Sequence, residues 1–336
     1  MDHGEALNTQ FVLRSRPEGA PRPENFELVR VPIPRLAKGT FLVRNAMIGL
    51  APASRIRMSE GHSYAAPTPL GGVIYSQSLG EVIASENEDF KPGEGVVLTD
   101  GGWQTHVVSD GSSAQKIDTS IAPPSVWLGT LGVSGLTAYV GLRNVARLQP
   151  RDTLLVSAAS GAVGSVAGQI AKAMGCRVVG IAGGERKVGY VREQLRFDDC
   201  VDYRSDRFRE HLLESSKDGF SVYFDNVGGA VRDAAVSVMA NHGRIVICGL
   251  ISEYNDRQAP SGPSWMPVLT KRLSVHGFLM RDHVGARDAF LAEMAGWLRD
   301  GKMRVLEDVV EGFENIPSAF IGMLMGRNFG KTLVRI

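Results

Sequence analysis

The stretch SAASGAVGSVAGQIAKAMGC, residues 157–176, places small residues between an apolar run and an amphipathic segment. The run TLLVS that leads into it is typical of a buried strand, and the apolar period after it is typical of a helix. A glycine-rich turn between a strand and a helix is the phosphate-binding element of dinucleotide-binding folds, with the fingerprint G-x-G-x-x-G. Here the frame reads ASGAVG, so Ala159 replaces the first glycine, which is tolerable only if its φ stays negative.

The small residues of this loop suit a bound pyrophosphate. A glycine at 161 permits the tight turn, and one at 164 brings the helix N-terminus, with its unpaired N–H groups and dipole, to the phosphates. Gly168, one helical turn later, allows close packing of the helix on the sheet. A glycine-rich turn without a ligand is the alternative, but the strand–helix units that follow favour a cofactor. The expected loop residues are Gly161, Ala162, Val163 and Gly164.

Strands and helices alternate from Thr153 onward. The strand-like segments are CRVVGIAG, DCVDY, FSVYFDNVGG, GRIVICGL and RLSVHGFL, and helical segments such as ERKVGYVREQLR separate most of them. Such alternation predicts a doubly wound parallel sheet with helices on both faces, a Rossmann-type α/β fold. We place this domain at residues 123–300.

Residues 1–122 have a different rhythm, with short β-branched segments interrupted by Pro and Gly. This pattern predicts a β-rich, barrel-like domain. The tail after residue 300 returns to the same pattern, so we expect 1–122 and 301–336 to form one domain together.

The bulk properties exclude several classes of protein. The 336 residues carry 37 Lys and Arg against 36 Asp and Glu, and a net charge of +1 gives no long-range attraction to nucleic acid or an acidic membrane. We find no signal peptide and no apolar stretch of about 20 residues. Three distant cysteines are typical of buried reduced thiols rather than of a disulfide framework. We therefore expect a soluble cytoplasmic protein.

The strand CRVVGIA ends in two glycines, at the position where enzymes that use NAD usually carry an acid for the adenosine ribose. Small residues beside cations instead suit a ribose phosphate. A solvated helix face is the alternative for Arg186 and Lys187, so the missing acid is the stronger part of the argument. The neighbouring residues are Gly183, Gly184, Glu185, Arg186 and Lys187, with Tyr203 and Arg204 at the end of the next strand. The predicted cofactor is NADP(H).

No zinc site is expected. Zinc dehydrogenases need His, Cys and Asp or Glu ligands around an open position, but the histidines here form no ligand-spaced cluster and the first 175 residues lack cysteine. Ser76 and Gln77 stand where such enzymes carry Gly-His-Glu, and Gly61-His62 reads as a surface turn. We expect the chemistry to proceed without a metal.

The whole chain resembles the zinc-independent medium-chain dehydrogenase/reductase superfamily. More narrowly, it is similar to the prostaglandin-reductase (leukotriene-dehydrogenase) group, which includes alkenal and enone double-bond reductases and curcumin-type reductases. The stretches that carry the resemblance are GEVIASENEDFKPGEGV, LGVSGLTAYVGL, AASGAVGSVAGQIAK, AGGERKVGYV, YFDNVGG, GRIVICGLISEYN, GFLMRD and GRNFGKTLVRI.

The resemblance implies a GroES-like substrate domain, a Rossmann domain and a cleft between them. It implies reduction of the C=C bond of α,β-unsaturated aldehydes or ketones by NADPH, in a homodimer paired through RLSVHGFL. By position, Gly183, Lys187 and Tyr203 would surround the ribose phosphate. Asn226, Phe278 and Leu279 would flank the nicotinamide ribose and ring, and Asn328 would reach back to the cofactor.

Tyr254 corresponds to a tyrosine at the mouth of the active site in this group. We expect it to act with a ribose hydroxyl as hydrogen-bond donor to the carbonyl oxygen that gains charge. Tyr254 or water would then protonate the α-carbon. A tyrosine that stacks over the cofactor without chemistry is the alternative.

The segment LAPASRIRM, residues 50–58, departs from the L-D-P-Y-M-R-x-R-M of the group, and its smaller side chains should reshape the substrate site. The expected pocket residues are Tyr64, Arg55 and Met58, although packing for the tyrosine and surface pairing for Arg55 and Arg57 are the ordinary alternatives. An alcohol, carbonyl or quinone oxidoreductase using NADP without zinc is the competing activity. A cofactor-binding protein without turnover is the competing class.

Overall fold

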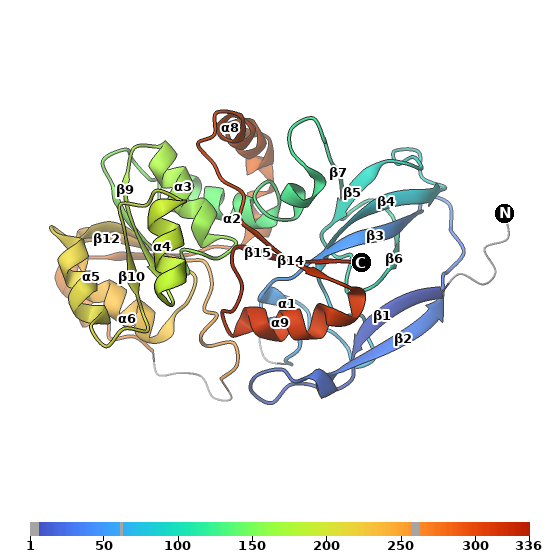
Figure 1. The fold of residues 1–336 in the computed structure, drawn as a ribbon, viewed down its shortest axis with the longest axis horizontal. Helices are drawn as coiled ribbons and strands as arrows, with labels where there is room; N and C mark the ends of the chain where they lie inside the picture. The colour runs from blue at the N-terminus through green and yellow to red at the C-terminus, as the bar shows by residue number, and fades with distance from the viewer. Residues whose placement is uncertain (1–6, 61–62, 257–261) are drawn as a thin grey trace. The chain divides into compact units, whose positions relative to one another are not determined.

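The computed structural model describes residues 7–60, 63–256 and 262–336 (Figure 1). The chain divides into two units, one formed by Met1–Gly129 with Glu307–Ile336 and the other by Thr130–Leu306. Gly61 and His62, expected to form a surface turn, lie outside the described residues.

The first unit is built on a seven-stranded sheet in the order β14-β15-β3-β4-β5-β7, with β6 paired to β3. A separate antiparallel pair joins β1 and β2. The C-terminal β15 pairs antiparallel with β3, so the end of the chain lies beside its N-terminal part within one sheet. The strands are β1 (Leu7–Leu13), β2 (Phe26–Pro32), β3 (Phe41–Gly49), β4 (Gln77–Ser85), β5 (Gly95–Leu98), β6 (His106–Ser109), β7 (Ala114–Lys116), β14 (Glu307–Glu311) and β15 (Lys331–Arg335).

Aromatic side chains fill the core of the first unit. Trp103 lies 5.2 Å from both Phe26 and Phe320, measured between ring centroids, and Phe320 comes from α9 (Ile316–Leu324). Met58, which directly follows α1 (Ala53–Arg57), belongs to the same cluster and is fully buried. The C-terminal helix is thus tied into this core by burial of apolar surface.

The second unit contains a six-stranded parallel sheet in the order β10-β9-β8-β11-β12-β13. Numbered from the first strand of the sheet, this is the order 3-2-1-4-5-6 of the Rossmann fold, which confirms the predicted fold class. The strands are β8 (Thr153–Ser157), β9 (Arg177–Ala182), β10 (Asp199–Asp202), β11 (Phe220–Asp225), β12 (Met239–Ile247) and β13 (Ser274–Gly277). The helices are α2 (Val133–Val140), α3 (Gly164–Ala173), α4 (Glu185–Glu193), α5 (Phe208–Ser216), α6 (Gly229–Ser237), α7 (Met266–Lys271) and α8 (Arg287–Arg299).

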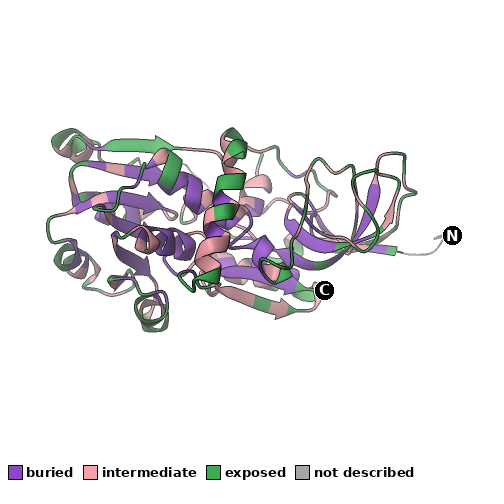
Figure 2. Ribbon diagram, turned by 90° about the horizontal axis from the view of Figure 1, so that it is seen from above, coloured by how far each residue is buried: buried purple, intermediate pink, exposed green. Residues whose placement is uncertain are grey.

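The inner strands of this sheet are buried on both faces, as their continuous apolar runs require. Nearly all residues of β8, β9 and β11 are buried, while the helices expose their outer sides (Figure 2). The edge strand β13 differs, because all four of its residues are exposed.

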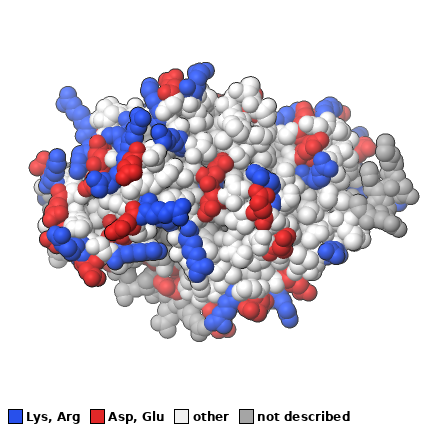
Figure 3. Space-filling view, viewed as in Figure 1, with Lys and Arg blue, Asp and Glu red and all other residues white. Residues whose placement is uncertain are grey.

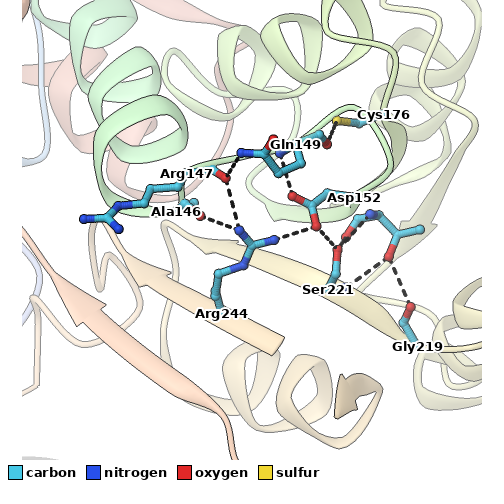
Figure 4. A network of polar contacts seen from close by, with 9 residues as sticks. Ala146, Arg147, Gln149, Asp152, Cys176, Gly219, Ser221 and Arg244 are labelled. Carbon is cyan, nitrogen blue, oxygen red and sulfur yellow. Dashed lines mark hydrogen bonds and ion pairs between the residues drawn. The ribbon is translucent and has the colours of Figure 1, made fainter. Parts of the chain in front are cut away.

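A polar network ties the chain together near the amino ends of β8 and β11 (Figure 4). Arg244 pairs with Asp152 at 2.5 Å and donates to the carbonyl oxygens of Ala146 and Arg147. Asp152 also accepts a hydrogen bond from the hydroxyl of Ser221 at 2.8 Å. The network therefore lies at the edge of the sheet opposite to the carboxyl ends of the strands, which the predicted cofactor residues follow.

Candidate functional site

Most of the predicted cofactor residues follow the carboxyl ends of strands in the second unit. The glycine loop follows β8, Gly183 follows β9 and Tyr203 follows β10. Asn226 follows β11 and Phe278 follows β13. In open parallel sheets, ligands bind outside these ends where the strand order reverses, which here is between β8 and β11. Segments that are distant in sequence are therefore brought to one edge.

The glycine loop tolerates alanine at its first position because the strain falls elsewhere. The positive φ is at Ala158, at +50°, and not at Ala159. The Cβ of Ala159 lies beside Gly180 of β9, where a second Cβ would approach it to 2.7 Å. A Cβ on Gly164 would lie 2.3 Å from the carbonyl oxygen of Ala158, so no side chain fits there. Gly180 is the compensating residue that the fingerprint alone does not reveal.

The third glycine of the stretch has a packing role. A Cβ on Gly168 would lie 1.8 Å from the ring of Phe197, which is buried between α4 and β10. The helix after the phosphate loop is therefore seated against this ring.

The N-terminus of α3 offers donors to an anion. Within the described part of the chain, the backbone N–H groups of Ala162, Val163 and Gly164 have no hydrogen-bond acceptor, whereas Ser165 already donates to the carbonyl of Gly161. Consecutive unpaired donors at the positive end of a helix bind phosphate readily. The residues present thus fit the pyrophosphate of a dinucleotide.

A buried carboxylate organises the edge between β8 and β11. The Oδ1 atom of Asp225 accepts hydrogen bonds from the hydroxyls of Tyr223, at 2.7 Å, and Ser157, at 3.1 Å. The Ser157 hydroxyl in turn accepts the backbone N–H of Asn226 at 2.8 Å, and the Asn226 amide donates to the Ser157 carbonyl. Burial raises the pKa of Tyr223 well above its usual range, so this phenol stays a donor. Asn226 is consequently fixed at the point where the strand order reverses.

The two glycines after β9 leave room for neighbouring side chains. A Cβ on Gly183 would lie 2.7 Å from the ring of Tyr203. Lys187 lies in the first turn of α4 and is half-buried. The three residues predicted around a ribose phosphate therefore come from adjacent segments at the ends of β9 and β10.

Tyr254 and Asn226 meet around Gly249. The phenol oxygen of Tyr254 would lie 3.2 Å from a Cβ on Gly249, and the carbonyl oxygen of Asn226 would lie 3.4 Å from it. Phe278 lies close to Gly141 at the end of α2, where a Cβ would approach its ring to 3.2 Å, and Leu279 beside it is half-buried.

The predicted pocket residues of the first unit do not gather at one place. Met58 is in the hydrophobic core, whereas Tyr64 is 48% exposed. Arg55 is buried, where it donates to the hydroxyl of Ser59 and the carbonyl of Gly19, and burial lowers its pKa. Asn328 donates to the carbonyl of Gly330 within its own turn.

A cavity of about 230 Å³ in the first unit is lined by Arg57 rather than by its neighbour Arg55. The guanidinium of Arg57 lies 3.9 Å from the ring centroid of Tyr75, which also lines the cavity. Burial raises the pKa of the Tyr75 phenol, with Arg57 acting in the opposite direction. The two arginines of α1 thus differ, since Arg55 is buried and Arg57 lines the cavity, and their spacing in the sequence does not predict this difference.

Residues 7–60, 63–256 and 262–336 contain no group of three His, Cys, Asp or Glu side chains arranged to hold a metal ion. The Ser76 hydroxyl donates to the carbonyl of Gly49 at 2.8 Å. In the same ranges, no helix combines the length and the apolar character needed to cross a membrane.

Known proteins align with nearly the full length of the chain. Residues 9–117 match a family described as the N-terminal domain of oxidoreductase, and residues 162–296 match one described as zinc-binding dehydrogenase. The chain is 40% identical to the NADPH-dependent curcumin reductase of Escherichia coli, over 100% of this chain and 99% of the relative. It is 38% identical to prostaglandin reductase 1 of Rattus norvegicus, over 97% and 98%. The crystal structure of CurA from Vibrio vulnificus in complex with NADPH matches with a TM-score of 0.93 and 42% identity, covering 97% of this chain and 98% of that one.

Proposed function

Since the chain belongs to the enone-reductase group of the medium-chain dehydrogenase/reductase superfamily, we propose that it reduces the C=C bond of α,β-unsaturated aldehydes and ketones with NADPH. The observation that carries the proposal is the combination of full-length similarity to named reductases with unpaired N–H groups at the point where the strand order reverses. Both the fold and the donor set of the second unit suit a dinucleotide.

The chain's own residues bind and orient the cofactor. Gly161, Ala162, Val163 and Gly164 hold the pyrophosphate, and Gly183, Lys187 and Tyr203 surround the ribose phosphate. Asn226, Phe278 and Leu279 flank the nicotinamide end, and Asn328 adds a contact from the C-terminal segment. When bound, NADPH supplies the hydride that reaches the β-carbon of the substrate.

Tyr254 is the proposed catalytic residue. Its phenol donates a hydrogen bond to the substrate carbonyl oxygen, where negative charge develops, and it or a water protonates the α-carbon. The hydrogen bond from Leu250 to the phenol oxygen supports this role, because it fixes the position of the hydroxyl.

The substrate domain is assigned to residues 1–122 with 301–336, and the Rossmann domain to 123–300. In the substrate domain, Tyr64 offers an exposed ring to the substrate. Arg55 and Met58 are buried, and we assign them to the substrate pocket as the residues that support the segment with the small side chains of Ala51, Ala53 and Ser54.

We further propose that the protein is a cytoplasmic homodimer. Three free cysteines are consistent with a reducing compartment. The exposed edge strand β13 offers unpaired backbone groups to the same strand of a second copy. Exposed apolar side chains on this strand and on the α7 segment that precedes it in the chain, namely Val275, Trp265 and Leu269, support the pairing. Light scattering should give twice the chain mass for the wild type and the monomer mass for Val275→Lys, because a lysine on an edge strand disfavours its pairing with another strand.

The activity is tested by NADPH oxidation with enals, enones, quinones, and simple aldehydes and ketones, with products identified by mass. Saturated carbonyl products support the proposal. Alcohols or quinols would instead move the chemistry to C=O or quinone reduction.

A further inference from the structure

The guanidinium of Arg204 lies over the tip of β9. A Cβ on Gly183 would lie 3.0 Å from Nε of Arg204, and a Cβ on Gly184 would lie 3.9 Å from its Nη1. This is the position from which an acidic side chain would reach the adenosine ribose in enzymes that use NAD. Here a cation from the end of β10 occupies the space that the two glycines leave open.

The side chain of Arg204 lies at the surface. Within the described ranges, Arg204 forms no ion pair, and its side-chain contact is with the ring of Tyr203, 5.7 Å from the centroid. By contrast, Arg207, three residues later, pairs with Glu210 at 2.7 Å and lies within 3.8 Å of Glu214. In Figure 3, Lys and Arg atoms on the part of the visible face around α3 and α4 lie among Asp and Glu atoms, so many of the cations there have acids beside them.

Asp202, the last residue of β10, joins the segment that follows β9 to the segment that follows β10. Its Oδ1 atom accepts the backbone N–H groups of Gly184 and Arg204, both at 2.9 Å. The carboxylate is therefore directed at backbone donors of two neighbouring loops. One acid near the ribose region thus fixes the backbone from which Arg204 projects.

From this arrangement we infer that Arg204 is a ligand of the ribose phosphate of NADPH and that Asp202 is the residue that positions it. The inference rests on the proposed use of NADPH and adds to Gly183, Lys187 and Tyr203 a determinant of cofactor choice. A guanidinium binds phosphate through charge-assisted, often bidentate hydrogen bonds, whereas a ribose hydroxyl gives it no charge to pair with. Arg204 should therefore stabilise bound NADPH and leave NADH almost unaffected.

The test measures dissociation constants of NADPH and NADH, and of the fragments 2′,5′-ADP and 5′-AMP, without turnover. For Arg204→Gln, we expect the affinities for NADPH and 2′,5′-ADP to fall by about 10- to 100-fold, the range for a lost hydrogen bond to a charged group. The affinities for NADH and 5′-AMP should stay within about twofold. Arg207→Gln, the matched control with an ion-paired arginine, should leave all four constants unchanged.

Two variants of Asp202 test its positioning role. Asp202→Asn keeps an acceptor oxygen, so it should retain NADPH affinity, whereas Asp202→Ala should weaken NADPH by several-fold and spare NADH. Equal losses for NADPH and NADH in Arg204→Gln, or no loss of NADPH, would overturn the inference while the proposed function stands. A wild-type protein that binds both dinucleotides equally would overturn the NADPH assignment itself, and the inference with it.

Discussion

The phenol oxygen of Tyr254 accepts a hydrogen bond from the backbone N–H of Leu250 at 3.1 Å. The bond closes a turn that directly follows β12, and it holds the phenol beside Gly249, against which Asn226 also lies. The position of the hydroxyl is thus fixed by the backbone, and removal of the hydroxyl alone tests its proposed role.

Replacement of this tyrosine by phenylalanine separates the two roles. In Tyr254→Phe, we expect kcat to fall by about tenfold or more, because a donor to the developing charge is removed, while the ring remains. The dissociation constant of NADPH should change little. Steady-state kinetics with a good enone substrate and a binding titration give both values, and unchanged turnover would remove the phenol from the mechanism.

The Ser157 hydroxyl links the phosphate-loop strand to Asn226. In Ser157→Ala, the Asn226 N–H loses its acceptor and Asp225 loses a donor, so the free energy of unfolding should fall by about 1–3 kcal/mol. NADPH should also bind more weakly. Urea unfolding and a binding titration measure the two effects, with Ser120→Ala, on an exposed turn, as the control. Wild-type stability and affinity in the variant would argue against the network.

The network of Arg244 should matter for stability alone. In Arg244→Gln, the buried carboxylate of Asp152 loses its cation, and we expect a loss of about 2 kcal/mol in the free energy of unfolding. Because the network lies away from the carboxyl edge of the sheet, the dissociation constant of NADPH should not change. The exposed pair Arg335–Glu311 supplies the control, since Arg335→Gln should cost under about 0.5 kcal/mol. Similar losses in both variants would contradict this assignment.

Lys331 gives the protein a specific pH dependence. Its ammonium is buried, donates to the carbonyl of Leu50 at 2.9 Å, and has its pKa lowered by burial from 10.5 to about 8. Between these two values the unfolded chain holds the proton more tightly than the folded protein, so this group makes stability rise with pH across that window.

In Lys331→Met, the apolar stem that packs against Gly49 and Gly129 is kept and the titrating group is lost. The free energy of unfolding of the wild type, minus that of Lys331→Met, should therefore increase between pH 7 and pH 10. Urea unfolding at several pH values tests this, and parallel profiles for the two proteins would contradict it.

The sequence identifies the Rossmann fold because both of its signals are local. Apolar strands and helical periods alternate, and the loop with Gly161 and Gly164 stands between the first such pair. The acceptance of Ala159 could not be predicted from the loop, because it depends on Gly180 in a neighbouring strand.

The roles of Asp202 and of residues 55–58 depend on contacts with residues that are distant in sequence, so the sequence alone does not predict them. From the sequence, an aspartate at the end of a strand is expected to face solvent. In the structure, its carboxylate instead joins the backbone of Gly184 to that of Arg204. Arg55, Arg57 and Met58 share one short segment, yet Arg57 lines a cavity while the other two are buried. Met58, which directly follows α1, shares a core cluster with Trp103 and with Phe320 of α9, and both are distant in sequence.

Reduction of a conjugated C=C bond with NADPH can be measured in a single assay. The purified protein is given an enone with NADPH or with NADH, and the product is identified by mass spectrometry. We expect the saturated ketone, formed with NADPH and far more slowly with NADH. An allylic alcohol as the product, or equal rates with the two cofactors, would contradict it.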